Sequence, residues 1–161
     1  MLLYHGSKDR SITKFKIFNN RNNLDFGLGV YLTTKEWQAR QWASPNGAIY
    51  VFDIDISGLK CIEYKDEDLN YVLYLCRIDL EDVARDTIDF FDDADIIMGP
   101  VLDGRTKGFE KIAEKFNEGD ITYEDFEKRI ELFDDKDQLC FKTQNAIDLL
   151  NKGFVQRIDI Q

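Results

Sequence analysis

Short stretches in which hydrophobic residues alternate with polar ones, or follow one another without a break, predict β-strands along much of the chain. The first covers residues 2–5 and ends at His5-Gly6-Ser7, where the glycine and serine favour a turn. Residues 14–18 fit a strand or an extended segment, and Gly99-Pro100 is expected to end the strand that precedes it. The other predicted strands cover residues 30–33, 48–54, 61–64, 95–98, 139–141 and 155–160.

Apolar residues at helical spacing predict helices between these strands. The predicted helices cover residues 35–43, 66–78 and 106–117, with two more in the last quarter of the chain. Threonines are expected to cap three of the helices: Thr34, Thr122 and Thr143. Residues 79–93 are expected to form helix followed by loop. The chain is therefore expected to fold as a single α+β domain, residues 1–161, with an acidic helical insertion in the middle of a β-rich core.

Composition and charge narrow the function classes. Of the 161 residues 43% are hydrophobic and 32% are charged, as in a globular domain. The formal net charge is −10, with 31 acidic and 21 basic residues. Nucleic-acid affinity depends mainly on Lys and Arg that neutralise phosphates, so a general nucleic-acid or anionic-membrane binder is not expected. An acidic surface favours a basic partner, such as a neutralising protein.

The cysteines and the absence of long apolar runs favour a cytoplasmic location. Cys61, Cys76 and Cys140 lie in apolar surroundings without metal-binding spacing, which is typical of free thiols in a reducing compartment. Residues 1–4 lead directly into polar residues, so no secretory leader is predicted. No apolar run approaches the roughly 20 residues that span a bilayer, so no membrane association is expected.

His5 is the only histidine in the chain. A single histidine at the end of a strand is either structural or catalytic, and no metal site is expected without a second histidine or a cysteine pair. Phe26-Gly27-Leu28-Gly29 either lets the backbone approach a ligand closely or forms a glycine bulge ahead of a strand. The third glycine of a dinucleotide-binding motif and the Gly-Lys of a phosphate-binding loop are missing, so neither motif is predicted.

Two aromatic residues and one amide complete the set of candidate residues. Tyr31 and Trp42 are either packing residues or aromatic faces around a flat heterocycle. Gln138 is expected at the start of a short apolar strand, where a polar residue is ordinary. None of these residues decides a function alone.

In their order along the chain, these segments resemble the diphtheria-toxin-like branch of the ADP-ribosyltransferases, which includes the poly-ADP-ribose polymerases. That branch has His-Gly-Ser at the end of one strand, Phe-Gly-x-Gly-x-Tyr at the start of another, and a third residue, often Glu, at the start of a later strand. Here the matching segments are His5-Gly6-Ser7, Phe26 to Tyr31, and Gln138. Most of the chain is also similar to a small bacterial and phage branch described as a domain of unknown function. That similarity lies in Leu24 to Gly27, Tyr31 to Thr34, Gln38-Ala39, Trp42-Ala43, residues 95–101 and residues 137–146.

The resemblance implies a split β-sheet core around a cleft for NAD, which would be a co-substrate, with no metal. It implies that His5 hydrogen-bonds the nicotinamide ribose and that Tyr31 stacks on the nicotinamide ring. Trp42 stands where the polymerases have a second stacking aromatic, whereas Ala39 replaces the serine that contacts their carboxamide. The residues expected to bind NAD are Gly6, Ser7, Phe26, Gly27, Gly29 and Trp42. Lys8, Arg10 and Arg21 are expected either to neutralise its pyrophosphate or to form a solvated face.

Gln138 is the departure from the family pattern that affects chemistry. A glutamine can hydrogen-bond a ribose hydroxyl, but it carries no charge and is not a base. Chain-elongating polymerase activity is therefore not expected, whereas transfer of a single ADP-ribose is compatible with the residue. Asp137 is a poor substitute, because neighbouring side chains of a strand face opposite ways.

We therefore expect a mono-ADP-ribosyltransferase with His5, Tyr31 and Gln138 as its catalytic residues. The acceptor stays open between a protein, a nucleic acid and a small molecule, and the resemblance suits an intracellular effector, toxin or phage-related enzyme. A catalytically silent module that binds NAD, a nucleotide or a partner protein is the alternative, and the neutral Gln138 favours it. An α+β domain with accidental motifs is a third hypothesis, disfavoured by the order of the matches.

Overall fold

A computed structural model describes residues 1–17, 26–64, 93–102, 111–112, 114–116, 118–129 and 132–161. The predicted helix at residues 66–78, nearly all of the predicted segment 79–93 and most of the predicted helix at 106–117 lie outside these residues. The predicted acidic insertion is therefore not described. The remaining elements define how the candidate residues are placed.

The described strands form two sheets, and the expected α+β class is confirmed. The three-stranded sheet is antiparallel and contains β1 (Leu2–Ser7), β3 (Ala48–Asp53) and β7 (Phe154–Asp159), in that order. The four-stranded sheet contains β2 (Val30–Leu32), β6 (Leu132–Phe141), β5 (Ile96–Leu102) and β4 (Cys61–Glu63), in that order. In this second sheet only the β4–β5 pair is parallel among the described strands.

One apolar core lies between the two sheets. Leu3 and Phe52 reach it from the three-stranded sheet, and Leu32 and Phe141 reach it from the four-stranded sheet. Helix α6 (Gln144–Lys152) adds its buried face to the same core. The opposite face of the three-stranded sheet is covered by helix α1 (Glu36–Ala43), which buries its small residues Ala39 and Ala43 there. The alternation of apolar positions in the strands produces this arrangement, because successive side chains point to opposite faces.

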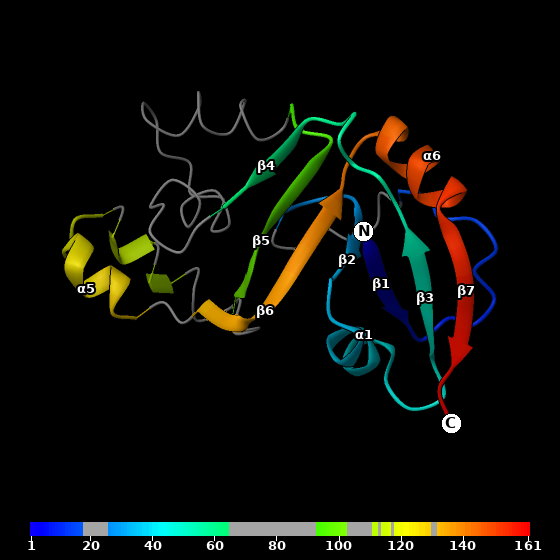
Figure 1. The fold of residues 1–161 in the computed structure, drawn as a ribbon. Coiled ribbons are helices and arrows are strands. Elements are labelled where there is room, and N and C mark those ends of the chain that lie inside the picture. Colours follow the sequence, from blue (N-terminus) through cyan, green and yellow to red (C-terminus); the bar gives the residue numbers. More distant parts are fainter. Residues whose placement is uncertain (18–25, 65–92, 103–110, 113, 117, 130–131) are drawn as a thin grey trace.

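Within the described residues, an isolated β-bridge joins the two sheets. Tyr4 of β1 and Thr33, just after β2, each donate a backbone hydrogen bond of 2.9 Å to the other's carbonyl oxygen. Figure 1 shows β2 between β1 and β6 as a result. The bridge therefore brings together the strands that carry His5, Tyr31 and Gln138.

Several predicted elements are confirmed, including both later threonine caps. The Thr122 hydroxyl accepts a hydrogen bond of 3.2 Å from Asp125 N at the start of helix α5 (Tyr123–Glu127). The Thr143 hydroxyl accepts one of 3.3 Å from Ala146 N at the start of α6. Residues 14–17 form no strand, and Phe15 among them is buried.

The first predicted cap is wrong. Helix α1 begins at Glu36 after Lys35, and no side chain caps it. Thr34 instead uses its hydroxyl and its backbone N–H to bind the Asp137 carboxylate. A tertiary partner therefore replaces the local one.

Two predicted strands are longer than expected. Strand β5 continues through Gly99-Pro100 to Leu102, with a register shift after Pro100. Asp137, which lies opposite Pro100, directs its N–H and C=O to Gln38, so the β5–β6 pair needs no N–H from the proline. Strand β6 begins at Leu132, not at residue 139. Its first half contains charged residues that hide the alternation, and Gln138 consequently lies inside the strand.

Candidate active site

His5 lies near the end of β1 and is half-buried. Its Nδ1 lies 2.7 Å from the backbone carbonyl oxygen of Tyr31. A carbonyl oxygen can only accept, so Nδ1 carries a hydrogen, and in the neutral form of the ring Nε2 is the acceptor nitrogen. The contact therefore fixes both the orientation and the tautomer of His5, and it ties β1 to β2.

Aromatic rings hold His5 from the core side. Phe15 packs edge-on against it, with ring centroids 5.1 Å apart, and Tyr50 lies opposite it on β3 at 6.3 Å. Phe15 is itself fixed by Asn151 of α6, whose Oδ1 accepts from Phe15 N at 2.8 Å and whose Nδ2 donates to Phe15 O at 3.0 Å. We call this pair of hydrogen bonds the Asn151 clamp.

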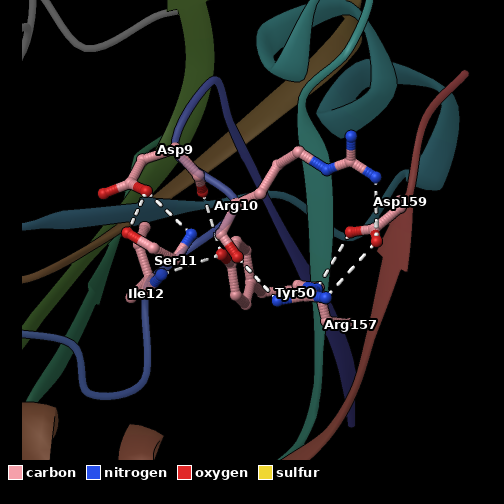
Figure 2. A network of polar contacts seen from close by, with 7 residues as sticks. All are labelled: Asp9, Arg10, Ser11, Ile12, Tyr50, Arg157 and Asp159. Carbon is pink, nitrogen blue, oxygen red and sulfur yellow. Dashed lines mark hydrogen bonds and ion pairs between the residues drawn. The ribbon is translucent and has the colours of Figure 1, made fainter.

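The loop that follows β1 is fastened by a polar network (Figure 2). The Tyr50 hydroxyl donates to Asp9 O at 2.9 Å and accepts from Ile12 N at 3.2 Å, and burial raises the pKa of Tyr50. Arg157 donates to Arg10 O at 2.6 Å. The Arg10 guanidinium pairs with Asp159 at 2.9 Å and lowers the pKa of that carboxyl, chiefly by hydrogen bonding.

This network changes what is expected of the nearby cations. Arg10, one of the cations considered for the pyrophosphate, is paired with Asp159, and Lys8 is exposed. Arg21 lies outside the described residues. The solvated-face alternative therefore describes Arg10 better than pyrophosphate binding does.

Tyr31 is half-buried at the centre of β2, and its hydroxyl closes the preceding loop. The hydroxyl donates to Gly27 O at 2.8 Å and accepts from Phe26 N at 2.8 Å. Gly27 has a φ of 77°, in the left-handed region that glycine adopts readily. The loop is therefore shaped by Tyr31 itself.

Three aromatic rings lie parallel beside this loop. The Tyr31 ring is parallel to Phe26, with centroids 6.2 Å apart and planes 1° apart. Phe26 is in turn nearly parallel to Tyr64, at 6.4 Å and 7°. Phe26 and Tyr64 are buried, whereas Tyr31 keeps part of its surface exposed. Of these three rings, Tyr31 is therefore the one that reaches the surface.

The expected NAD-binding glycines are tightly packed against backbone. A Cβ on Gly6 would lie 1.9 Å from Ala39 O, so only glycine lets α1 approach β1 this closely. A Cβ on Gly29 would lie 2.4 Å from Cys140 Sγ and 2.7 Å from Phe141 O. Close packing therefore accounts for both glycines.

Ser7 and Trp42 lie in different surroundings. The Ser7 hydroxyl accepts from Asp9 N at 3.1 Å and so belongs to the loop after β1. Trp42 is half-buried on α1, and within the described residues it makes no ring contact with Tyr31. The structure brings His5, Tyr31, Phe26 and Gly27 into contact, and it does not pair the two expected stacking aromatics.

Gln138 is buried on β6, with only 4% of its surface exposed. Its Nε2 donates to Pro100 O on β5 at 3.1 Å. Tyr31 lies directly opposite Cys140 in the β2–β6 pair, and Gln138 is two residues from Cys140. Opposite residues and alternate residues share a face, so Tyr31 and Gln138 lie on the same face of this sheet.

A polar cluster around Asp137 lies next to Gln138, and the sequence does not predict it; Gln38 and Thr33 in it are buried, whereas Thr34 is exposed. Gln38 on α1 is completely buried; its Nε2 donates to Asp137 O at 2.6 Å and its Oε1 accepts from Asp137 N at 3.2 Å. We call this pair of hydrogen bonds the Gln38 clamp. The hydroxyls of Thr33 and Thr34 bind the Asp137 carboxylate. The sequence gives only a weak signal for this cluster, which is a glutamine directly before Ala39 on the buried side of a helix.

The described part of the chain contains neither a metal-binding group nor a membrane-spanning helix. No group of three or more His, Cys, Asp and Glu residues there is arranged to hold a metal ion. No helix there is both long enough and apolar enough to cross a membrane.

A family model described as a protein of unknown function, DUF3990, matches residues 1–152. The chain belongs to the DUF3990 family. The match contains every residue of the candidate site, from His5 to Gln138, so the site is part of the DUF3990 domain. No curated protein and no solved structure matches the chain.

Proposed function

We propose that this DUF3990 protein is an NAD-dependent mono-ADP-ribosyltransferase. The observation that carries the proposal is the junction of β1, β2 and β6. There His5 is bonded to the Tyr31 carbonyl, and Tyr31 shares a sheet face with Gln138. Three segments that resemble the ADP-ribosyltransferase motifs, far apart in the sequence, thus meet in the fold. The proposal includes an ADP-ribosyltransferase-like split-sheet core, which the two sheets joined at Tyr4 and Thr33 support.

The geometry of each residue suits the role that the resemblance implies. The Nδ1–H bond to Tyr31 directs the His5 ring, and its Nε2 is the acceptor for a ribose hydroxyl. Tyr31 is the half-buried ring of a parallel set with Phe26 and Tyr64, and an aromatic face of this kind suits stacking on a nicotinamide ring. The Gln138 side chain supplies an amide on the same face for hydrogen bonding to the ribose.

The reaction cleaves the bond between ribose C1′ and the nicotinamide nitrogen. The nicotinamide leaves with the electron pair of that bond and becomes neutral, and the ribose develops oxocarbenium character. The acceptor then forms a bond to C1′ and releases a proton. The chain's own residues orient the ring and the ribose during these events, and positioning of this kind supplies a large part of many rate enhancements.

The surroundings of Gln138 favour an amide at this position. Its Nε2 donates to the Pro100 carbonyl oxygen. A glutamate would place a carboxylate oxygen there, which repels a carbonyl oxygen unless the carboxyl is protonated. The site therefore acts without a fixed negative charge, which suits transfer of one ADP-ribose to a strong nucleophile and does not suit chain elongation.

Nicotinamide release from NAD by the purified protein tests the proposal. His5→Ala and Tyr31→Ala are expected to reduce release by about 100-fold, because each removes a group that positions the substrate. Two matched variants separate binding from folding. His5→Asn keeps a donor for the Tyr31 carbonyl but lacks an acceptor at the Nε2 position, and should be as impaired as His5→Ala. Tyr31→Phe keeps the stacking ring and should retain more activity than Tyr31→Ala.

The silent binding module is the second candidate function, and the neutral Gln138 favours it. Calorimetric titration with NAD on the same samples distinguishes the two. Binding that depends on Tyr31, without release in the presence of varied acceptors, would support the silent module. Absence of both binding and release would contradict every NAD-based function for this chain.

A further inference from the structure

Gln38 is an unusual residue for the buried face of α1. Its neighbours on that face, Ala39 and Ala43, are small and apolar, whereas Gln38 carries a polar carboxamide and is fully buried. Burial of an amide without hydrogen bonds is costly, so the group must be bonded. The Gln38 clamp meets this need with the backbone of one residue, Asp137.

The Gln38 clamp takes the place of a missing strand. Strand β2 pairs with β6 from Val30 opposite Phe141 to Leu32 opposite Leu139. The next residue, Thr33, uses its backbone to bridge Tyr4 of β1. The carboxamide of Gln38 supplies the donor and acceptor that a neighbouring strand would exchange with Asp137. The β6 backbone is therefore held on this side directly before Gln138.

The side chain of Asp137 is hydrogen-bonded as well as its peptide. Thr33 and Thr34 donate their hydroxyl hydrogens to the two carboxylate oxygens, and Thr34 N donates to one of them at 3.1 Å. Thr33 Oγ1 also lies 3.2 Å from Gln38 Oε1 and accepts from Lys35 N at 3.1 Å. Thr33 and Gln38 are fully buried, and hydrogen bonds shielded from water are stronger than exposed ones.

We infer that Gln38 is a positioning residue, which fixes Asp137 and thereby sets the place of the Gln138 side chain against Pro100 and beside Tyr31. The catalytic consequence rests on the proposed transferase function. The positional consequence does not, because it concerns the Gln138 amide itself. A displacement of about 1 Å at a reacting group can reduce a rate by about 100-fold, so a residue with no role in binding NAD would still control turnover.

The direct test is nuclear magnetic resonance of the Gln138 side-chain amide, assigned by comparison with Gln138→Ala. Gln38→Met has a similar length but neither hydrogen bond, and Gln38→Glu keeps the acceptor for Asp137 N while losing the donor to Asp137 O. Both are expected to shift the Gln138 amide signals and to speed exchange of its protons with solvent. Ile147→Val is the matched control, because it removes core volume in α6 and should leave these signals unchanged. Unchanged Gln138 signals in folded Gln38→Met would overturn the inference.

The kinetic test uses a double-mutant cycle. Gln38→Met is expected to lower kcat for nicotinamide release by about 10- to 100-fold, with the Kd for NAD changed much less. In a Gln138→Ala background the same substitution should have no further effect on kcat, because it acts through the side chain already removed. Additive losses in the double variant would show that Gln38 acts in some other way.

Failure of this inference is distinguishable from failure of the proposed function. A wild-type protein that neither binds NAD nor releases nicotinamide contradicts the transferase, while the response of the Gln138 amide to Gln38→Met still decides the positioning role. If the wild type is active but its Gln138 amide signals are unchanged in Gln38→Met, the transferase function stands and the positioning role of Gln38 is contradicted.

Discussion

Two side-chain amides perform the same task at opposite ends of the candidate site. The Gln38 clamp fastens Asp137, which precedes Gln138, and the Asn151 clamp fastens Phe15, which packs on His5. Gln38 is fully buried and shares its oxygen with Thr33. Asn151 is half-buried, and its nitrogen also donates to Ile147 O of its own helix at 3.0 Å.

The difference shows how the two ends of the site are stabilised. At the His5 end, ring packing by Phe15 and Tyr50 and the bond to Tyr31 O act together with the Asn151 clamp. At the Gln138 end, the Gln38 clamp and the Asp137 carboxylate bonds are polar. Their partners Gln38 and Thr33 are fully buried, whereas Thr34 is exposed. The His5 end should therefore tolerate the loss of its amide better than the Gln138 end does.

The largest effect on the free energy of unfolding is expected from a substitution that moves α1. Helix α1 carries Gln38, so the substitution moves the Gln38 clamp and leaves the Asn151 clamp in place. In Gly6→Ala the new Cβ would lie 1.9 Å from Ala39 O and 2.8 Å from Ala43 N, so α1 must shift away from β1. We expect a loss of about 3 kcal/mol in the free energy of unfolding, measured with urea. Hydrogen exchange should quicken at Asp137 N more than at Phe15 N.

Gly58→Ala is the control for this change, because a Cβ at Gly58 would have no heavy atom within 4 Å beyond Gly58 and its two chain neighbours. Its effect should stay below about 0.5 kcal/mol. Equal losses in the two variants would contradict the close approach of α1 to β1.

The next largest effects on the free energy of unfolding are expected from removing each clamp in turn. Gln38→Met leaves the N–H and C=O of Asp137 without these partners, beside a side chain that is fully buried, and should cost about 2 kcal/mol. Asn151→Leu should cost about 1 kcal/mol, because water reaches a half-buried site and replaces part of the bonding. Urea unfolding of both variants measures the difference. A larger loss for Asn151→Leu would reverse the comparison.

The smallest effect on the free energy of unfolding is expected from a substitution of Asp159, which pairs with Arg10 in the loop after β1. The hydrogen bond from Arg10 holds the pKa of Asp159 below its ordinary value, and the charges of Arg10 and Arg157 add to this. A lowered carboxyl pKa stabilises the folded state above the unfolded pKa of about 3.9, and this contribution is lost as the pH falls through the lower folded value. Urea unfolding of wild type and Asp159→Asn should therefore differ slightly at neutral pH and converge in acid. A gap that stays constant into acid would contradict the assignment.

Much of the fold follows from local patterns. Residues 30–33 alternate and form β2 almost as predicted, and Thr143 caps α6 because both the threonine and the apolar stripe after it lie within a few residues. Strand β6 was predicted too short, because the charged residues of its first half have no visible period. Local patterns determine elements where the signal and the structure lie in the same short segment.

The site could be predicted only in part. The residues His5, Tyr31 and Gln138 stood out by type and order, and the meeting of their strands at the Tyr4–Thr33 bridge is a tertiary property. Gln38 stood out only within the family similarity, and Asn151 not at all, because a lone amide in an amphipathic helix is ordinary. Their partners lie 99 and 136 positions away, at distances that local periodicity does not report.

Those separations also have a consequence for biosynthesis. A growing chain contains His5, Gln38 and Tyr31 early, but neither clamp can close before Asp137 and Asn151 have left the ribosome. Contacts between such distant positions form slowly, since a long loop must close first. Both ends of the site are therefore completed only after most of this chain has been translated.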